Sequence, residues 1–132
     1  MEEIQIDWLV VAIGTILNMA IGFFWYSKWI FGAAWMKLAE VSEKHMKENK
    51  SAIVYGVIVS FITVFFLALF EGFLGITTVS DGMFVGFCFW LGFVATTQIS
   101  SVIWLRKPLH LFFIDTGYKL LSLVAIGGLI GA

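Results

Sequence analysis

Four long apolar stretches restrict the possible folds of this chain more than any other feature. They cover about residues 6–25, 52–70, 82–105 and 109–132. A helix needs about 20 mainly apolar residues to cross the hydrocarbon core of a bilayer. A soluble helix would carry a polar face along its length, and long parts of these stretches have none. The sequence therefore predicts an all-α protein, an integral membrane four-helix bundle.

The overall composition agrees with this prediction. Apolar residues make up 61% of the 132 residues and charged residues 13%, a mixture well outside that of soluble globular domains. No repeat, linker or low-complexity segment divides the chain, so we expect one domain over residues 1–132 that is surrounded by membrane lipids. The net charge of −1 gives no basic surplus that would attract nucleic acid, and we expect no nucleic-acid partner.

The positive charges predict the orientation of the bundle. Five lysines lie in the first connection, residues 26–51, and Arg106 and Lys107 lie in the third connection. The second connection and both tails contain no lysine or arginine, and Lys119 lies within the fourth stretch. By the positive-inside rule, the first and third connections face the cytoplasm and both termini face outward.

The first connection contains a charged helical segment, "AAWMKLAEVSEKHMKENK" (residues 33–50). Glu40 and Lys44 are an acid and a base at a four-residue spacing, which stabilises a helix. We expect a short cytoplasmic interfacial helix between spans 1 and 2, broken near Ser42, and a solvated connector is the alternative. We expect the side chain of His45 to be exposed and to bind no metal, because no second ligand stands at a suitable spacing.

Each predicted span carries a stripe of small or polar residues at helical spacing. The stripes are Gly14, Asn18, Gly22 and Trp25 in the first span, Gly56, Ser60, Thr63, Leu67 and Glu71 in the second, Thr97, Gln98 and Ser101 in the third, and Asp115, Lys119 and Ser122 in the fourth. Helix packing is the ordinary explanation, because small residues allow close approach and polar residues hydrogen-bond across the contact. Gly82 with Gly86, and Gly127 with Gly131, have the GxxxG spacing, which is weak evidence by itself.

Four of the polar residues are expected at similar depth. At a rise of about 1.5 Å per residue, Asn18, Gln98 and Asp115 lie roughly 9 to 12 Å above the cytoplasmic ends of their helices, and Lys119 has a flexible stem. We therefore predict an intramembrane polar cluster of Asp115, Lys119, Asn18 and Gln98, in which Asp115 and Lys119 form an ion pair. Such a pair either sets the helix register or belongs to a proton or ion route.

The fourth span also has a smooth face, formed by Gly117, Leu121, Val124 and Gly128. A helix with a polar face and a small-residue face can contact protein on both sides. We therefore expect a homo-oligomer.

Three motifs carry a resemblance to a known family. "WYSKWIFGAAWMKL" (25–38), "WLGFVATTQ" (90–98) and "RKPLHLFFIDTGYKL" (106–120) resemble the domain of unknown function 1761 family of small bacterial four-span membrane proteins, and the similarity covers nearly the whole chain. That family often has proline where this chain has Lys28, and histidine near Lys119. The resemblance implies a multi-pass protein of the bacterial cytoplasmic (inner) membrane and supplies no activity.

Two classes of function are compatible with these features. The first is a subunit of a channel or transporter for protons, ions or a small solute that uses the Asp115–Lys119 pair. The alternative is a lipid-binding, hydrophobic-ligand-binding or accessory protein without transport activity, which the apolar stripes and the fourteen phenylalanines favour. We expect no enzyme activity, catalytic residue, cofactor or metal, because the chain has no metal-ligand cluster, activated nucleophile or phosphate-binding glycine loop.

Overall fold

The computed structural model describes residues 4–132, apart from the side chains of residues 45–47, which include His45 and its predicted exposure. Its helices are α1 (Trp8–Trp25), α2 (Gly32–Ala39), α3 (Glu43–Glu48), α4 (Ser51–Leu74), α5 (Val79–Phe89), the π-helix η1 (Trp90–Ala95), α6 (Thr96–Leu105) and α7 (Leu109–Gly131). The described part of the chain contains no β-strand. The prediction of an all-α fold is therefore confirmed.

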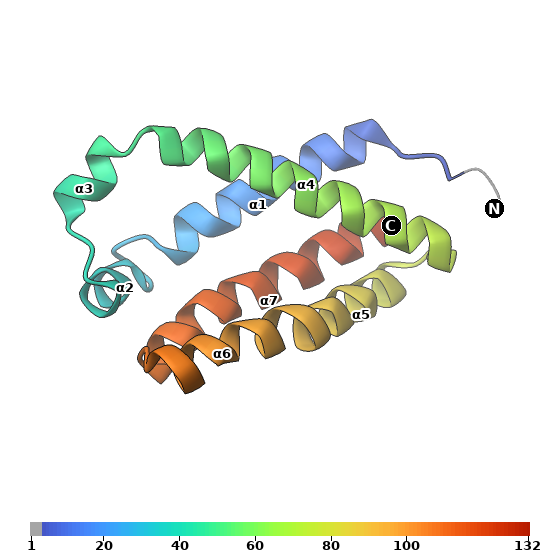
Figure 1. The fold of residues 1–132 in the computed structure, drawn as a ribbon. Helices are drawn as coiled ribbons and strands as arrows, with labels where there is room; N and C mark the ends of the chain where they lie inside the picture. The colour runs from blue at the N-terminus through green and yellow to red at the C-terminus, as the bar shows by residue number, and fades with distance from the viewer. Residues whose placement is uncertain (1–3) are drawn as a thin grey trace.

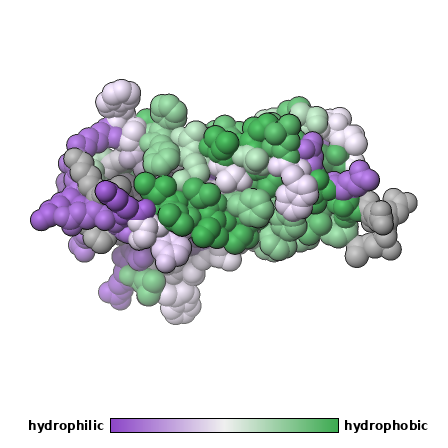
Figure 2. All heavy atoms as spheres, turned by 90° about the horizontal axis from the view of Figure 1, so that it is seen from above, coloured by the Kyte–Doolittle hydropathy of each residue, from purple (hydrophilic) through white to green (hydrophobic). Residues whose placement is uncertain are grey.

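Four helical segments are long and apolar enough to cross a membrane. They are Trp8–Trp25, Ser51–Leu74, Val79–Leu105 and Leu109–Gly131. The second segment continues beyond its predicted end at Phe70, so that Glu71 lies inside the helix. Figure 2 shows an apolar middle section, with hydrophilic residues gathered mainly at one end. The chain is a membrane protein.

Helix α7 lies at the centre of the fold. It contacts α1, α2, α4 and the three helices of the third span, α5, η1 and α6. Figure 1 shows α7 running beside the third span, with α1 and α4 crossing on its other side. The buried apolar core joins α1, α4, α5 and α7 through Val11, Val64, Leu67, Val85, Leu123 and Ile126.

The two ends of the bundle differ in charge. The first described residues, the C-terminus and the α4–α5 connection lie at one end, which we call the termini end (Figure 1). Helices α2 and α3 and the α6–α7 turn lie at the other end, which we call the basic end because it holds Lys28, Lys37, Arg106 and Lys107. The expected short helix between the first two spans is present as α2 and α3, with the break at residues 40–42.

The expected pairing of Glu40 with Lys44 is wrong. Glu40 ends α2 in the left-handed conformation, with φ of 59°, so the two residues belong to different helices and no longer share a face. Lys44 instead lies 3.9 Å from Glu48 (Nζ to Oε1), and Lys28 lies 2.5 Å from Glu43 (Nζ to Oε1).

Helices α5 and α7 approach each other through glycines. A Cβ atom at Gly82 would overlap the carbonyl oxygen of Gly127, and a Cβ at Gly86 would overlap that of Leu123. Gly131 is equally close to the carbonyl oxygen of Thr78. The two GxxxG pairs therefore face each other in one interface, where the missing side chains let the backbones touch. Thr78 caps α5, since its hydroxyl accepts from the Asp81 N–H.

Two tryptophans fix α7 to its neighbours at the same depth. The indole Nε1 of Trp90, the first residue of η1, donates to the carbonyl oxygen of Thr116 at 2.7 Å. The indole Nε1 of Trp25, the last residue of α1, donates to the carbonyl oxygen of Ile114 at 2.8 Å. Both bonds hold the segment of α7 that carries Asp115.

Candidate functional site

Asn18 joins three of the membrane-spanning helices. Its Nδ2 donates to the Ser60 hydroxyl of α4 at 2.6 Å, and its Oδ1 accepts from the Ser122 hydroxyl of α7. Its backbone carbonyl oxygen accepts from the hydroxyl of Tyr118, also on α7, at 3.2 Å. Polar side chains in a bilayer interior need such partners, because lipid tails offer none. The predicted polar stripes of α1, α4 and α7 meet at this residue.

Asp115 is bound by a tyrosine from the end of α1. The hydroxyl of Tyr26 donates to Asp115 Oδ1 at 2.6 Å. Burial raises the pKa of Tyr26, and the hydrogen bond to the Asp115 carboxyl raises that pKa further, so Tyr26 is a phenol that donates. The Tyr26 ring also packs edge-on against the ring of Tyr118, with the centroids 5.5 Å apart. The two tyrosines thus connect Asp115 with Asn18.

The other two residues of the predicted cluster, Gln98 and Lys119, take no part in these hydrogen bonds. Gln98 lines a pocket of about 320 Å³ together with Asp115 and Lys107. Lys119 is exposed. The described side chains form two ion pairs, and neither includes Asp115 or Lys119. The predicted Asp115–Lys119 ion pair is therefore absent, because Asp115 already accepts from Tyr26 and Lys119 lies at the exposed edge of α7.

Sequence reasoning missed both tyrosines. Asp115, Tyr118 and Ser122 stand at spacings of three and four residues, which is the pattern of one helix face. This pattern could have identified Tyr118 as a partner for α1. Tyr26 follows the last residue of α1, and no pattern in the sequence pointed to it.

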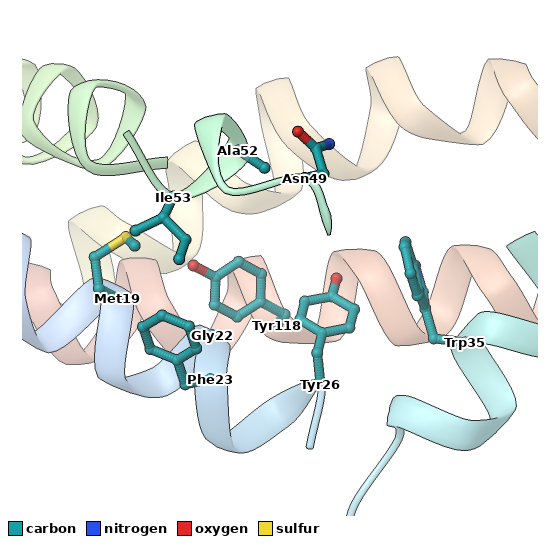
Figure 3. A pocket seen from close by; sticks show the side chains of 9 residues that line it. All are labelled: Met19, Gly22, Phe23, Tyr26, Trp35, Asn49, Ala52, Ile53 and Tyr118. Atoms are coloured by element: carbon teal, nitrogen blue, oxygen red, sulfur yellow. The ribbon is translucent and has the colours of Figure 1, made fainter. Parts of the chain in front are cut away.

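The two tyrosines form part of the wall of a pocket of about 430 Å³. The pocket is lined by Met19, Gly22 and Phe23 of α1, Tyr26, Trp35 of α2, Asn49, Ala52 and Ile53 at the start of α4, and Tyr118 of α7. Figure 3 shows the rings of Tyr118, Tyr26 and Trp35 in a row along it. Its volume and its mainly apolar lining with a few polar groups are typical of small-molecule sites.

The pocket exists because α1 and α4 diverge toward the basic end (Figure 1). Nearer the termini end they are in contact, and a Cβ at Gly14 would lie 2.8 Å from Val64 Cγ1. Toward the basic end, Gly56 meets only the flexible tip of Met19 within 4 Å of the Cβ position. Ile53, one turn earlier, is 52% exposed. The wedge-shaped space between the two helices is therefore open to the surface of the bundle.

The face of α7 expected to contact a second copy is partly covered within the protomer. A Cβ at Gly117 would lie 3.0 Å from the Trp25 ring, and one at Gly128 would lie 2.8 Å from the Met83 side chain. Leu121 is exposed. Two of the four residues behind the homo-oligomer prediction are thus explained by contacts inside one chain, and oligomer formation stays a prediction.

Comparison with known protein families gives a match over nearly the whole chain. The family described as "Protein of unknown function (DUF1761)" matches residues 9–131. No curated protein and no solved structure matches the chain. The matched range contains the Asn18 network, the Tyr26–Asp115 hydrogen bond and the residues that line the pocket.

Proposed function

We propose that this chain, which belongs to the DUF1761 family of proteins of unknown function, is a membrane-embedded lipid-binding protein without transport or enzyme activity. The observation that carries the proposal is the pocket of about 430 Å³ between α1, α2, α4 and α7. It combines an apolar wall with a polar end, which matches an amphipathic molecule.

The pocket suits one lipid in a definite orientation. Met19, Phe23 and Ile53 provide a surface for an acyl chain, and the open wedge between α1 and α4 lets the rest of that chain stay in the bilayer. Asn49 provides an amide for the headgroup, and Lys50 follows it at the start of α4. In this proposal the basic end faces the cytoplasm of the bacterial inner membrane, so the lipid comes from the cytoplasmic leaflet.

A substitution that fills the pocket tests the proposal. Ala52→Phe places a ring in the pocket, while Val54→Phe places the same ring two residues further along α4, at an exposed position that does not line it. Native mass spectrometry of the protein extracted in mild detergent measures the retained lipid. We expect one retained lipid in the unsubstituted protein and in Val54→Phe, and a loss of roughly tenfold in Ala52→Phe, about 1.4 kcal/mol of binding.

Two results would contradict lipid binding at this site. One is an unsubstituted protein that carries no lipid under conditions that preserve its fold. The other is equal retention by the two phenylalanine variants, which would place the lipid on the outer surface of the bundle.

A proton- or ion-conducting subunit is the second candidate, and one observation favours it. Asn18, Tyr118, Tyr26 and Asp115 form a continuous series of polar and aromatic groups from the middle of the bundle toward the basic end. Protein reconstituted in liposomes with a trapped pH-sensitive dye tests this candidate. Flux that Asp115→Asn abolishes would support conduction, and an absence of flux in both proteins would support the binding proposal.

A further inference from the structure

Glu71 is a buried acid without a hydrogen-bond partner in the described part of the chain. It lies in the last turns of α4, its exposed fraction is 1%, and neither carboxylate oxygen has a hydrogen-bond partner among the described residues. An ionised carboxylate that is removed from water without a partner is very costly, and such a group becomes neutral instead. The neutral acid has a proton to donate, whereas the carboxylate can only accept.

The groups around Glu71 match the protonated form. A Cβ at Gly82 would lie 2.7 Å from Glu71 Oε1 and would overlap the carbonyl oxygen of Gly127. The carboxyl group and this carbonyl therefore border the same position in the α5–α7 contact. A backbone carbonyl only accepts hydrogen bonds, so it is a suitable neighbour for a COOH group and an unfavourable one for a carboxylate.

Among the described residues, no positively charged side chain forms an ion pair with Glu71. At the start of α1, Asp7 and Glu71 line one pocket, and Asp7 Oδ1 accepts from the Leu9 and Val10 N–H groups. From α5, Asp81 is exposed, and α7 has no charged side chain beyond Lys119. The charged groups near Glu71 on the described helices that pack against it are thus acidic.

Glu71 also borders a pocket at the termini end of the bundle. It lines a pocket of about 200 Å³ at the termini end together with Gln5, Asp7 and Ile130. Gln5 and Asp7 are exposed, so the pocket that borders Glu71 reaches the outside of the bundle. This pocket is distinct from the proposed lipid site, which lies toward the basic end.

We propose that Glu71 is a proton-binding site that exchanges its proton with the solution at the termini end. In the protonated state the acid stays in the contact between α4, α5 and α7. Loss of the proton leaves a carboxylate beside the Gly127 carbonyl oxygen, where both groups are acceptors. The end of α4 must then separate from α5 and α7 or admit water, so proton release opens the termini end of the bundle.

Infrared spectroscopy of the protein in liposomes tests this site directly. A protonated carboxyl gives a C=O band above the amide I band, and Glu71→Gln keeps the size of the side chain while removing the acid. We expect the band at neutral pH in the unsubstituted protein, its loss in Glu71→Gln and its retention in the matched control Glu40→Gln, which removes an exposed acid at the basic end.

Exchange with the solution is measured on the unsubstituted protein, so it does not depend on the folding of a variant. Transfer to D2O should shift the Glu71 band to lower frequency, and raising the pH should convert it to the carboxylate band. A spectrum that Glu71→Gln leaves unchanged would overturn the proposal. A Glu71 band that neither D2O nor pH alters would also overturn it, because it would show a sealed structural acid.

Discussion

Replacing Gly86 with alanine should separate α5 from α7 and destabilise the bundle. The added Cβ would overlap the backbone of Leu123 on α7, and a backbone cannot turn aside as a flexible side chain can. Overpacking of this kind costs about 3 kcal/mol when the neighbour cannot move. The higher helix propensity of alanine offsets about 1 kcal/mol of this cost. The net loss is about 2 kcal/mol, which changes the ratio of folded to unfolded protein by a factor of about 30.

Gly92 provides the matched control, because a Cβ at Gly92 has nothing within 4 Å. Gly92→Ala makes the same chemical change in the same span without the overlap, so the difference between the two variants isolates the helix contact. Titration with sodium dodecyl sulfate, followed by far-ultraviolet circular dichroism, measures both free energies of unfolding. Equal stability of the two variants would refute the glycine-mediated contact between α5 and α7.

Three further predictions concern the polar contacts of the site. Asn18→Ala should lower the free energy of unfolding by about 1 kcal/mol, since interhelical hydrogen bonds in membranes contribute about 0.6 kcal/mol each, while Thr63→Ala, which loses only a bond within its own helix, should change it little in the same titration. Trp90→Phe should cost about 1 kcal/mol, because it removes the indole donor to the Thr116 carbonyl oxygen; an unchanged midpoint would contradict this. Tyr26 has a raised pKa from burial and its acceptor, so its contribution to stability should be complete below the unfolded value of about 10 and fall as the pH rises above it. Unfolding titrations at increasing alkaline pH should show this decline in the unsubstituted protein and a smaller decline in Tyr26→Phe.

The helical architecture could be predicted because the bilayer imposes it. An apolar run that crosses hydrocarbon must satisfy its backbone internally, and a helix does so within one segment. The end of α4 could not be predicted as easily. Glu71 is an acid that follows an apolar run, a position that indicates the edge of the membrane. The helix instead continues to Leu74, and the acid is buried. Its burial depends on Gly82 of α5, where a Cβ atom would lie 2.7 Å from Glu71 Oε1.

Only part of the site could be predicted. Helical spacing assigns residues to a face of a helix, but it does not identify their partners. Asn18 and Asp115 both lie on inward faces, as expected. Their partners are Ser60 of α4, Tyr118 and Ser122 of α7, and Tyr26 at the end of α1. The spacing of Asp115 and Lys119 is compatible with an ion pair, but a tyrosine hydroxyl from α1 reaches the carboxyl instead. Such competition depends on how α1 ends against α7, which the sequence pattern does not encode.

The two ends of the bundle combine opposite kinds of packing, and α7 connects them. At the termini end, glycine contacts bring backbones together around Glu71, so a single charge there has a large effect on packing. At the basic end, α1 and α4 diverge and the space between them is bordered by the mobile side chain of Met19 and by aromatic rings. Since the Trp25 and Trp90 indoles hold α7 from both neighbouring spans, movement of α4 at the termini end should reach the lipid pocket mainly through α4 itself. Loss of lipid at alkaline pH in the unsubstituted protein, but not in Glu71→Gln, would show that the two sites are coupled along this helix.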